Sequence, residues 1–189
     1  MRALRLLTVP LLVSAAIAAC NDRAPTSSTS STSSPLAYDA SRASGPPAVL
    51  TTPLPPVGGF VSQVLSRGRF LDDIDMTFRI KFGATTVVHV DDPSDVVMAR
   101  ITIQPHSALP WHTHPGPAIV SVASGELTLV DGEGCEVRPY SVGTAFMDEG
   151  HGHVHTAFNA TDVETVLYVT YLDVPAGQSP LVPAANPGC

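Results

Sequence analysis

Residues 110–130 read PWHTHPGPAIVSVASGELTLV, and this stretch decides the fold. His112 and His114 stand two positions apart, so in an extended chain their side chains face the same side. A Pro-Gly-Pro turn follows them, and then come two short apolar runs separated by a Ser-Gly pair. The pattern predicts two short strands, preceded by a segment that presents two imidazoles to one surface.

Short apolar and β-branched runs continue on both sides of this stretch. We predict strands at residues 85–90, 96–103, 118–123, 126–130, 144–146, 153–158 and 163–174. Helical periodicity nowhere extends beyond two turns, although residues 61–70 are compatible with a short helix. Many short strands at close spacing predict one all-β sandwich or barrel, which we place at residues 60–175.

The last of these runs, residues 163–174, is apolar on both faces. One face is expected to fill the barrel. The other is expected to pack against a second layer, the N-terminal extension or a partner subunit, so the pattern allows a homodimer of barrels. Met98, Phe146 and Met147 are expected in the core or in the wall of a pocket.

Six of the seven histidines lie between residues 106 and 155. His153 and His155 repeat the two-residue spacing of His112 and His114, so each pair presents two imidazoles to one face of a strand. Two such pairs on neighbouring strands can converge on one point. Imidazoles in that arrangement bind a divalent transition metal, and Fe, Zn, Mn, Cu and Ni all fit.

These residues resemble the two motifs of the cupin superfamily. His112 and His114 followed by Gly125 match the first motif, and Gly152, His155 and Asn159 match the second. The resemblance covers roughly residues 87–174. It implies a small cupin-type double-stranded β-helix, or jelly-roll barrel, whose metal ligands are His112, His114 and His155.

The chain departs from these motifs at the position of one ligand, because Ala118 stands where the first motif has its glutamate. His153 is our preferred fourth ligand, while Asp148 or Glu149 from the preceding loop are alternatives. The histidines could instead only hydrogen-bond one another. Of the other histidines, we expect His106 at the pocket mouth and His151 exposed in a Gly-rich turn. His89 is expected at the surface, or in the core with its ring nitrogens hydrogen-bonded. Trp111 is expected in the core or at the pocket rim.

The N-terminus has the layout of a secretory signal peptide at residues 1–19. Residues 17–20, Ile-Ala-Ala-Cys, resemble the lipobox of bacterial lipoproteins, which implies that Cys20 is lipidated and anchors an exported protein to the bacterial cell membrane. A Ser/Thr/Pro-rich linker at residues 20–59 follows, and its composition predicts a disordered tether. In an oxidising compartment the remaining cysteines, Cys135 and Cys189, are expected to form a disulfide that pins the C-terminal tail, residues 176–189.

Composition and charge limit the classes of molecule that this protein is expected to bind. The formal net charge is −7 and no Lys/Arg cluster occurs, which argues against nucleic acid, and the predicted membrane contact is the lipid anchor only. Two function classes remain: a metal-dependent, non-haem oxygenase or isomerase acting on a small molecule, or a non-enzymatic envelope lipoprotein that binds a metal or small ligand. A roomy pocket with open coordination positions would favour the enzyme, and a saturated four-histidine site would favour metal capture or a structural role.

Overall fold

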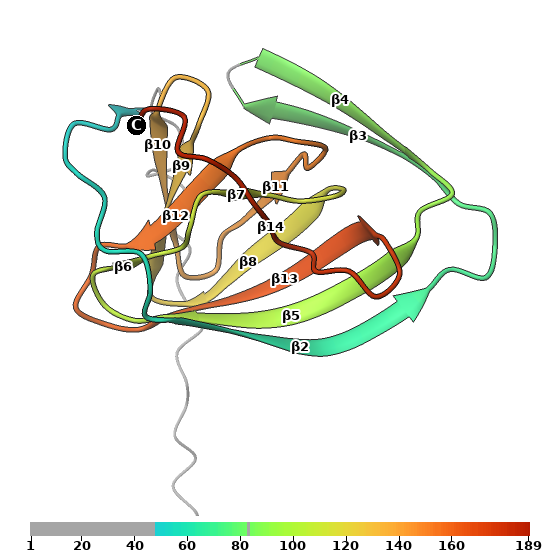
Figure 1. Ribbon diagram of the computed structural model, residues 1–189, viewed down its shortest axis with the longest axis horizontal. Helices are drawn as coiled ribbons and strands as arrows, with labels where there is room; N and C mark the ends of the chain where they lie inside the picture. The colour runs from blue at the N-terminus through green and yellow to red at the C-terminus, as the bar shows by residue number, and fades with distance from the viewer. Residues whose placement is uncertain (1–47, 83) are drawn as a thin grey trace, which may run out of the picture. The chain divides into compact units, whose positions relative to one another are not determined.

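The computed structural model describes residues 48–82 and 84–189, and within them every element is a β-strand. One sheet follows the order β1 (Ala48–Val49), β10 (Glu136–Ser141), β9 (Glu126–Asp131), β12 (His155–Asn159), β7 (His112–Thr113) and β14 (Val182–Pro183), and β6 (Ser107–Ala108) also pairs with β12. The second sheet follows the order β11 (Ala145–Asp148), β8 (Ala118–Ser124), β13 (Thr165–Val174), β5 (Asp95–Ile103) and β2 (Phe60–Arg69). Strands β3 (Asp75–Phe82) and β4 (Ala84–Asp91) form a separate hairpin (Figure 1).

The core lies between the inner faces of the two large sheets. Strand β8 shows why these residues form a strand: Ala118, Val120 and Val122 are buried, whereas Ile119 and Ser121 between them are exposed. Strands β5 and β13 alternate in this way only in their central parts, residues 97–101 and 167–171, and have consecutive buried residues outside them; the two strands pair with each other along most of their length. Period-two burial on antiparallel strands is what a two-layered β-barrel requires. The predicted all-β, cupin-type jelly-roll fold is therefore confirmed.

The short helix expected at residues 61–70 is wrong, because this segment is strand β2. Val61, Val64 and Leu65 have helix-like spacing, yet the backbone pairs with β5 from Phe60↔Ile103 to Arg69↔Asp95. Long-range pairing with the edge of the sheet outweighs weak local periodicity. Strands β3 and β10 were not predicted, and β10 has little strand signal because it contains Glu136, Arg138 and Pro139.

The outer face of the five-stranded sheet is open to solvent in the described part of the chain. Met98, Ile119 and Tyr168 are 46%, 44% and 47% exposed. The expected burial of Met98 is therefore wrong, since its side chain points away from the core on β5. The second layer predicted over this face is not supplied by residues 48–82 or 84–189, and the homodimer stays a proposal.

The last part of the predicted linker, residues 48–59, contacts the barrel. Residues 48–59 are hydrogen-bonded to it, since Leu50 N donates to Cys135 O (2.8 Å) and Ala108 N donates to Pro56 O (3.0 Å). The signal peptide at residues 1–19, Cys20 and the linker up to residue 47 lie outside the described residues. Within the described ranges, no helix has the length and apolar character to cross a membrane.

The C-terminal tail returns to the first sheet after β13. Its strand β14 pairs with β7, and the predicted disulfide joins Cys135 to Cys189, with the two Cα atoms 5.5 Å apart. The tail is drawn in dark red in Figure 1, where it runs across the barrel beside β7. The last residues of the chain are thus tied to the β9–β10 connection.

Candidate metal centre

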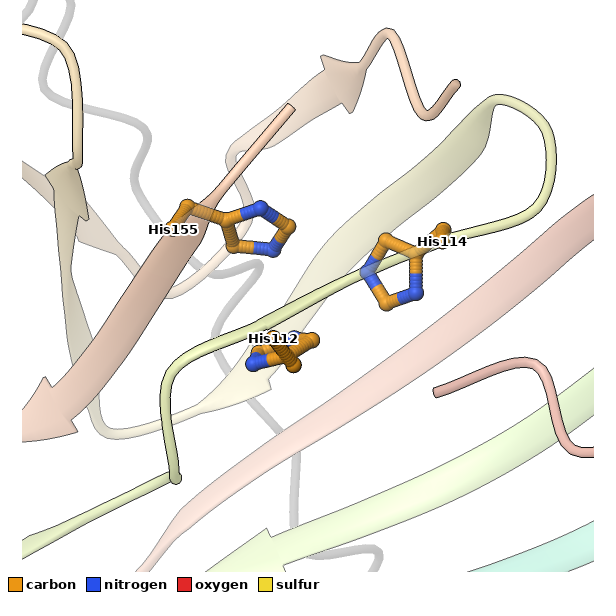
Figure 2. Close-up of side chains that lie close together, drawn as sticks. All are labelled: His112, His114 and His155. Atoms are coloured by element: carbon orange, nitrogen blue, oxygen red, sulfur yellow. The ribbon is translucent and has the colours of Figure 1, made fainter. Parts of the chain in front are cut away.

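Three predicted ligands come together on one face of the first sheet. His112 lies on β7, His114 follows that strand, and His155 begins β12 directly opposite His112 in the antiparallel register. The ring centroids are 4.4 Å apart for His112 and His155, 4.9 Å for His112 and His114, and 5.1 Å for His114 and His155. All three side chains are buried, and Figure 2 shows the rings gathered around a common space.

The backbone determines which nitrogen of each ring faces that space. His112 Nδ1 lies 2.7 Å from Pro110 O, and His114 Nδ1 lies 2.7 Å from Pro180 O. Because a carbonyl oxygen only accepts, both Nδ1 atoms carry the proton and both Nε2 atoms keep a free lone pair. His155 Nδ1 likewise lies 3.3 Å from the carbonyl of His153. Metal-binding histidines are characteristically oriented by such hydrogen bonds through the non-ligating nitrogen.

The environment keeps these rings neutral. Burial, together with the neighbouring imidazoles, lowers the pKa of His112 to about 3, and burial is also the main reason that the pKa of His155 falls to about 4. Burial lowers the pKa of His114 as well. A neutral imidazole is the form that binds a metal, so no proton has to be displaced near neutral pH.

Both ring nitrogens of His153 are paired with carboxylates, and its ring stacks on that of His155 with the centroids 5.3 Å apart. Its Nδ1 lies 2.6 Å from Asp148 Oδ2, and its Nε2 lies 3.3 Å from Asp131 Oδ2. Burial opposes protonation of His153. The hydrogen bond and the negative charge of Asp148 outweigh this effect and raise the pKa of His153 to about 9. Burial opposes ionisation of Asp148 too, yet the His153 hydrogen bond holds the pKa of that carboxyl far below its ordinary value. The two residues form an ion pair.

Asp148 connects this ion pair to the histidine cluster. Its Oδ1 accepts from Gly150 N (2.8 Å), and its Oδ2 also lies 3.3 Å from His155 Nδ1. Asp148, His153 and His155 form a second group with metal-ligand spacing. The distances within it are those of hydrogen bonds, so Asp148 serves to orient His155 and His153. The suggested role of His153 as a fourth ligand stays a prediction.

The space beside the three rings is small and apolar. The cavity measures about 30 Å³, enough for one or two water-sized ligands, and its walls come from both sheets. A neighbouring cleft of about 130 Å³ reaches Ile80 on β3 and shares Leu129, Phe146 and Asp148 with the cavity. Phe146, which stacks on Tyr140 with ring centroids 4.3 Å apart, therefore forms part of the wall between the two spaces.

The other candidates lie outside the histidine cavity. His106 is on an exposed loop with Nε2 2.8 Å from Asp162 Oδ1, so its expected place at the pocket mouth is wrong. His151 is exposed and His89 lies at the surface beside Thr77, as predicted. Trp111 is buried, and Glu149 lines only the outer clefts.

Two features of the site have no signal in the sequence. The carbonyl groups of Pro110 and Pro180 orient His112 and His114, but every residue carries a carbonyl group and Pro180 is 66 positions away from His114. The second feature is Gly150, whose backbone lies against that of Gly116. Its φ is +66°, and a Cβ atom there would collide with the backbone of Gly116, so this tight approach requires glycine.

Comparison with known proteins agrees with this architecture. Residues 99–171 match the family model of the cupin domain. That range includes His112, His114 and His155, and it falls within the two-sheet barrel. The barrel of this chain is therefore a cupin domain and belongs to the cupin superfamily. No curated protein matches the chain.

Three solved structures have a partly similar course of the chain. A cupin domain from Bordetella pertussis Tohama I is 18% identical, covering 62% of this chain and 97% of its own, with a TM-score of 0.42. An oxalate oxidase structure is 28% identical over 47% of this chain and 46% of its own, with a TM-score of 0.40. A cupin 2 conserved barrel domain protein from Leptotrichia buccalis is 16% identical, covering 60% and 40%, with a TM-score of 0.39. The chain thus spans less than half the length of the oxalate oxidase.

Proposed function

We propose that this cupin domain binds one divalent transition metal through the Nε2 atoms of His112, His114 and His155. The observation that carries the proposal is the set of Nδ1 hydrogen bonds, which leaves the Nε2 atoms of three neutral, buried rings free. Each of these rings offers a ligand nitrogen, and the three nitrogens lie within 4.8 Å of one another. Hydrogen bonds among the rings alone would not account for this arrangement. Fe, Zn, Mn, Cu and Ni are all compatible with three imidazole ligands.

We further propose that the metal centre is catalytic, as an oxygenase or isomerase of a small molecule. Three protein ligands leave coordination positions open, and both nitrogens of His153 are already paired with carboxylates. A bound metal would supply Lewis-acid or redox chemistry at the open positions. An organic substrate would have to approach from the 130 Å³ cleft past Phe146, because the cavity itself has room only for water-sized ligands.

That small cavity also supports a second candidate function. A centre that admits only water-sized ligands suits a lipoprotein that captures a metal or another small ligand without transforming it. Phe146 separates the two candidates, because an enzyme needs this wall to open during turnover and a capture protein does not.

The first test is the metal content of the full chain, purified without chelator or a polyhistidine tag and measured by mass spectrometry. We expect about one equivalent in the wild type and less than a tenth of that in the His112→Ala/His114→Ala double variant. The matched control is His106→Ala/His151→Ala, which removes two exposed histidines and should keep the full equivalent.

The outcome directs the next step. If neither the wild type nor the control holds metal, even after reconstitution with each of the five ions, the metal-site proposal is wrong. If iron is bound, oxygen consumption with small-molecule libraries tests the oxygenase. If zinc or copper is bound without turnover of any substrate, the capture function is favoured instead.

A further inference from the structure

The C-terminal strap, residues 176–189, contacts the proposed metal centre directly. Pro180 O accepts the Nδ1 hydrogen of His114, and β14 pairs with β7 through Val182↔Thr113 and Pro183↔His112. Ala184 N then donates to Trp111 O (2.9 Å). The strap therefore contacts the segment that carries two of the three ligands, and Figure 1 shows it lying along β7.

The strap has few other attachments. Every residue from 176 to 189 is described, and none of their side chains is buried. Arg67 Nη2 donates to Gln178 O (2.6 Å) near the start of the strap, and the disulfide to Cys135 fastens the end. A segment without buried side chains gains little from packing to offset the entropy lost on ordering. The covalent link at Cys189 is thus the main restraint on the strap beyond Gln178, the part that includes Pro180.

We propose that the Cys135–Cys189 disulfide is a thiol-sensitive latch that controls how firmly His114 is positioned in the metal centre. This inference rests on the proposed metal site. A dithiol reductant would donate two electrons and two protons, so that the sulfur–sulfur bond breaks, Cys135 and Cys189 become thiols and the reductant closes its own disulfide. Both cysteines are half-buried, which leaves the bond partly accessible.

Release of the strap acts on His114 more than on the other ligands. His112 keeps its hydrogen bond to Pro110 and His155 keeps those to the His153 carbonyl and Asp148, because none of these partners belongs to the strap. His114 loses Pro180 O, which accepts its Nδ1 hydrogen bond. Loss of a hydrogen-bond partner behind a metal ligand typically weakens metal binding 10- to 100-fold. Reduction should therefore speed metal release by about that factor.

The test uses the full chain with Cys20→Ser, so that Cys135 and Cys189 are its only cysteines. Co²⁺ is loaded, and its transfer to a chelator is followed by visible absorption in the oxidised protein, in protein reduced anaerobically and freed of reductant, and in Cys135→Ser/Cys189→Ser. We expect release about 10- to 100-fold faster in the last two. Ala185→Ser, an exposed change in the strap that keeps the disulfide, should release Co²⁺ at the oxidised rate.

A second readout does not depend on metal. In the metal-free protein, hydrogen exchange of residues 176–189 and the nitrogen-15 signal of the His114 side chain report whether the strap and its hydrogen bond are in place. Reduction should speed exchange in the strap at least tenfold and leave β5 and β13 unchanged. Equal Co²⁺ release in both redox states, or equal exchange, overturns the latch while leaving the metal site standing. Failure of the oxidised protein to bind any metal overturns the proposed function, and the exchange measurement then still decides whether the latch exists.

Discussion

At the scale of single residues, the site separates neutral from charged imidazoles over a short distance. His112 and His155 face one another in the apolar interior and are held neutral, whereas His153 next to them is held protonated by Asp148. The Asp148 carboxylate lies 3.3 Å from Nδ1 of His155. His155, the first residue of β12, and His153, two positions before it, therefore lie in two different electrostatic environments.

This separation predicts a stability optimum in the metal-free protein. Below pH 6.5, His112 and His155 bind protons in the unfolded chain but stay neutral in the folded protein. The free energy of unfolding therefore falls as the pH drops from 6.5 toward 4. Above pH 6.5 folded His153 keeps a proton that the unfolded chain loses, so its contribution fades as the pH rises through about 9. Each such histidine changes the free energy of unfolding by up to about 1.4 kcal/mol per pH unit within its window. Thermal or urea unfolding from pH 4 to 9 measures both declines in stability, which we call the acid limb (below pH 6.5) and the alkaline limb (above pH 6.5).

Two single variants test which histidine causes each limb of the pH profile. His153→Gln should remove the alkaline limb and lower the free energy of unfolding near pH 6.5 by about 1.5–3 kcal/mol, the typical net contribution of a hydrogen bond to a charged group. His112→Gln should flatten part of the acid limb and leave the alkaline one. A profile in which His153→Gln retains the alkaline decline would contradict the assigned ion pair.

At the scale of elements, Asn159 joins the end of β12 to the end of β5. Its side chain is fully buried, and its Nδ2 donates to Val163 O (2.7 Å) and Ile103 O (3.2 Å) while its Oδ1 accepts from Thr161 N (2.9 Å). The amide supplies donors and an acceptor at once, which explains why the second motif ends on asparagine. The turn that leads into β13 depends on this one side chain.

We expect Asn159→Ala to lower the free energy of unfolding by about 2–4 kcal/mol, because it leaves buried backbone groups unpaired and opens a cavity. Urea denaturation measures the loss. Asn159→Asp, which keeps the acceptor but not the donors, should recover little of it at neutral pH. Gln63→Ala, which removes an exposed amide on β2, is the matched control and should change stability by less than about 0.5 kcal/mol.

Sequence predicts those elements whose burial alternates along the strand, and β8 is an example. It fails for β2, where exposed valines have helical spacing, and the pairing partner β5 lies about 30 residues further along the chain. For the site, spacing alone predicts that the pairs His112/His114 and His153/His155 converge. The resemblance to the cupin motifs is what selected His112, His114 and His155 as the three ligands. The partner of His114 could not be predicted, because a backbone carbonyl at Pro180 is specified only by where the strap folds.

At the scale of the whole molecule, we propose that the domain is exported and tethered to a membrane by Cys20. The support is the sequence of residues 1–20 together with a disulfide between the other two cysteines, which suits an oxidising compartment. Homodimer formation through the open face at Met98, Ile119 and Tyr168 is a further proposal, which sedimentation of the full chain tests.

Cell fractionation tests the anchor. The wild-type chain, expressed in a bacterial host, should partition into the detergent phase and the membrane pellet. Cys20→Ser should shift most of the protein, at least tenfold relative to the wild type, into the aqueous phase or leave it as an unprocessed precursor. Cys189→Ser, which changes a cysteine far from the signal, should remain in the membrane fraction. Equal partitioning of wild type and Cys20→Ser would exclude lipidation at this residue.

Trp111 is the only tryptophan of the chain, and it is buried immediately before His112. Its carbonyl is also the acceptor for Ala184 of the strap. A single indole next to a paramagnetic or redox-active ion is expected to lose emission, and an indole that gains contact with water shifts its emission to longer wavelength. The chain therefore carries an intrinsic fluorophore through which filling of the centre and detachment of the strap can be distinguished in unlabelled protein.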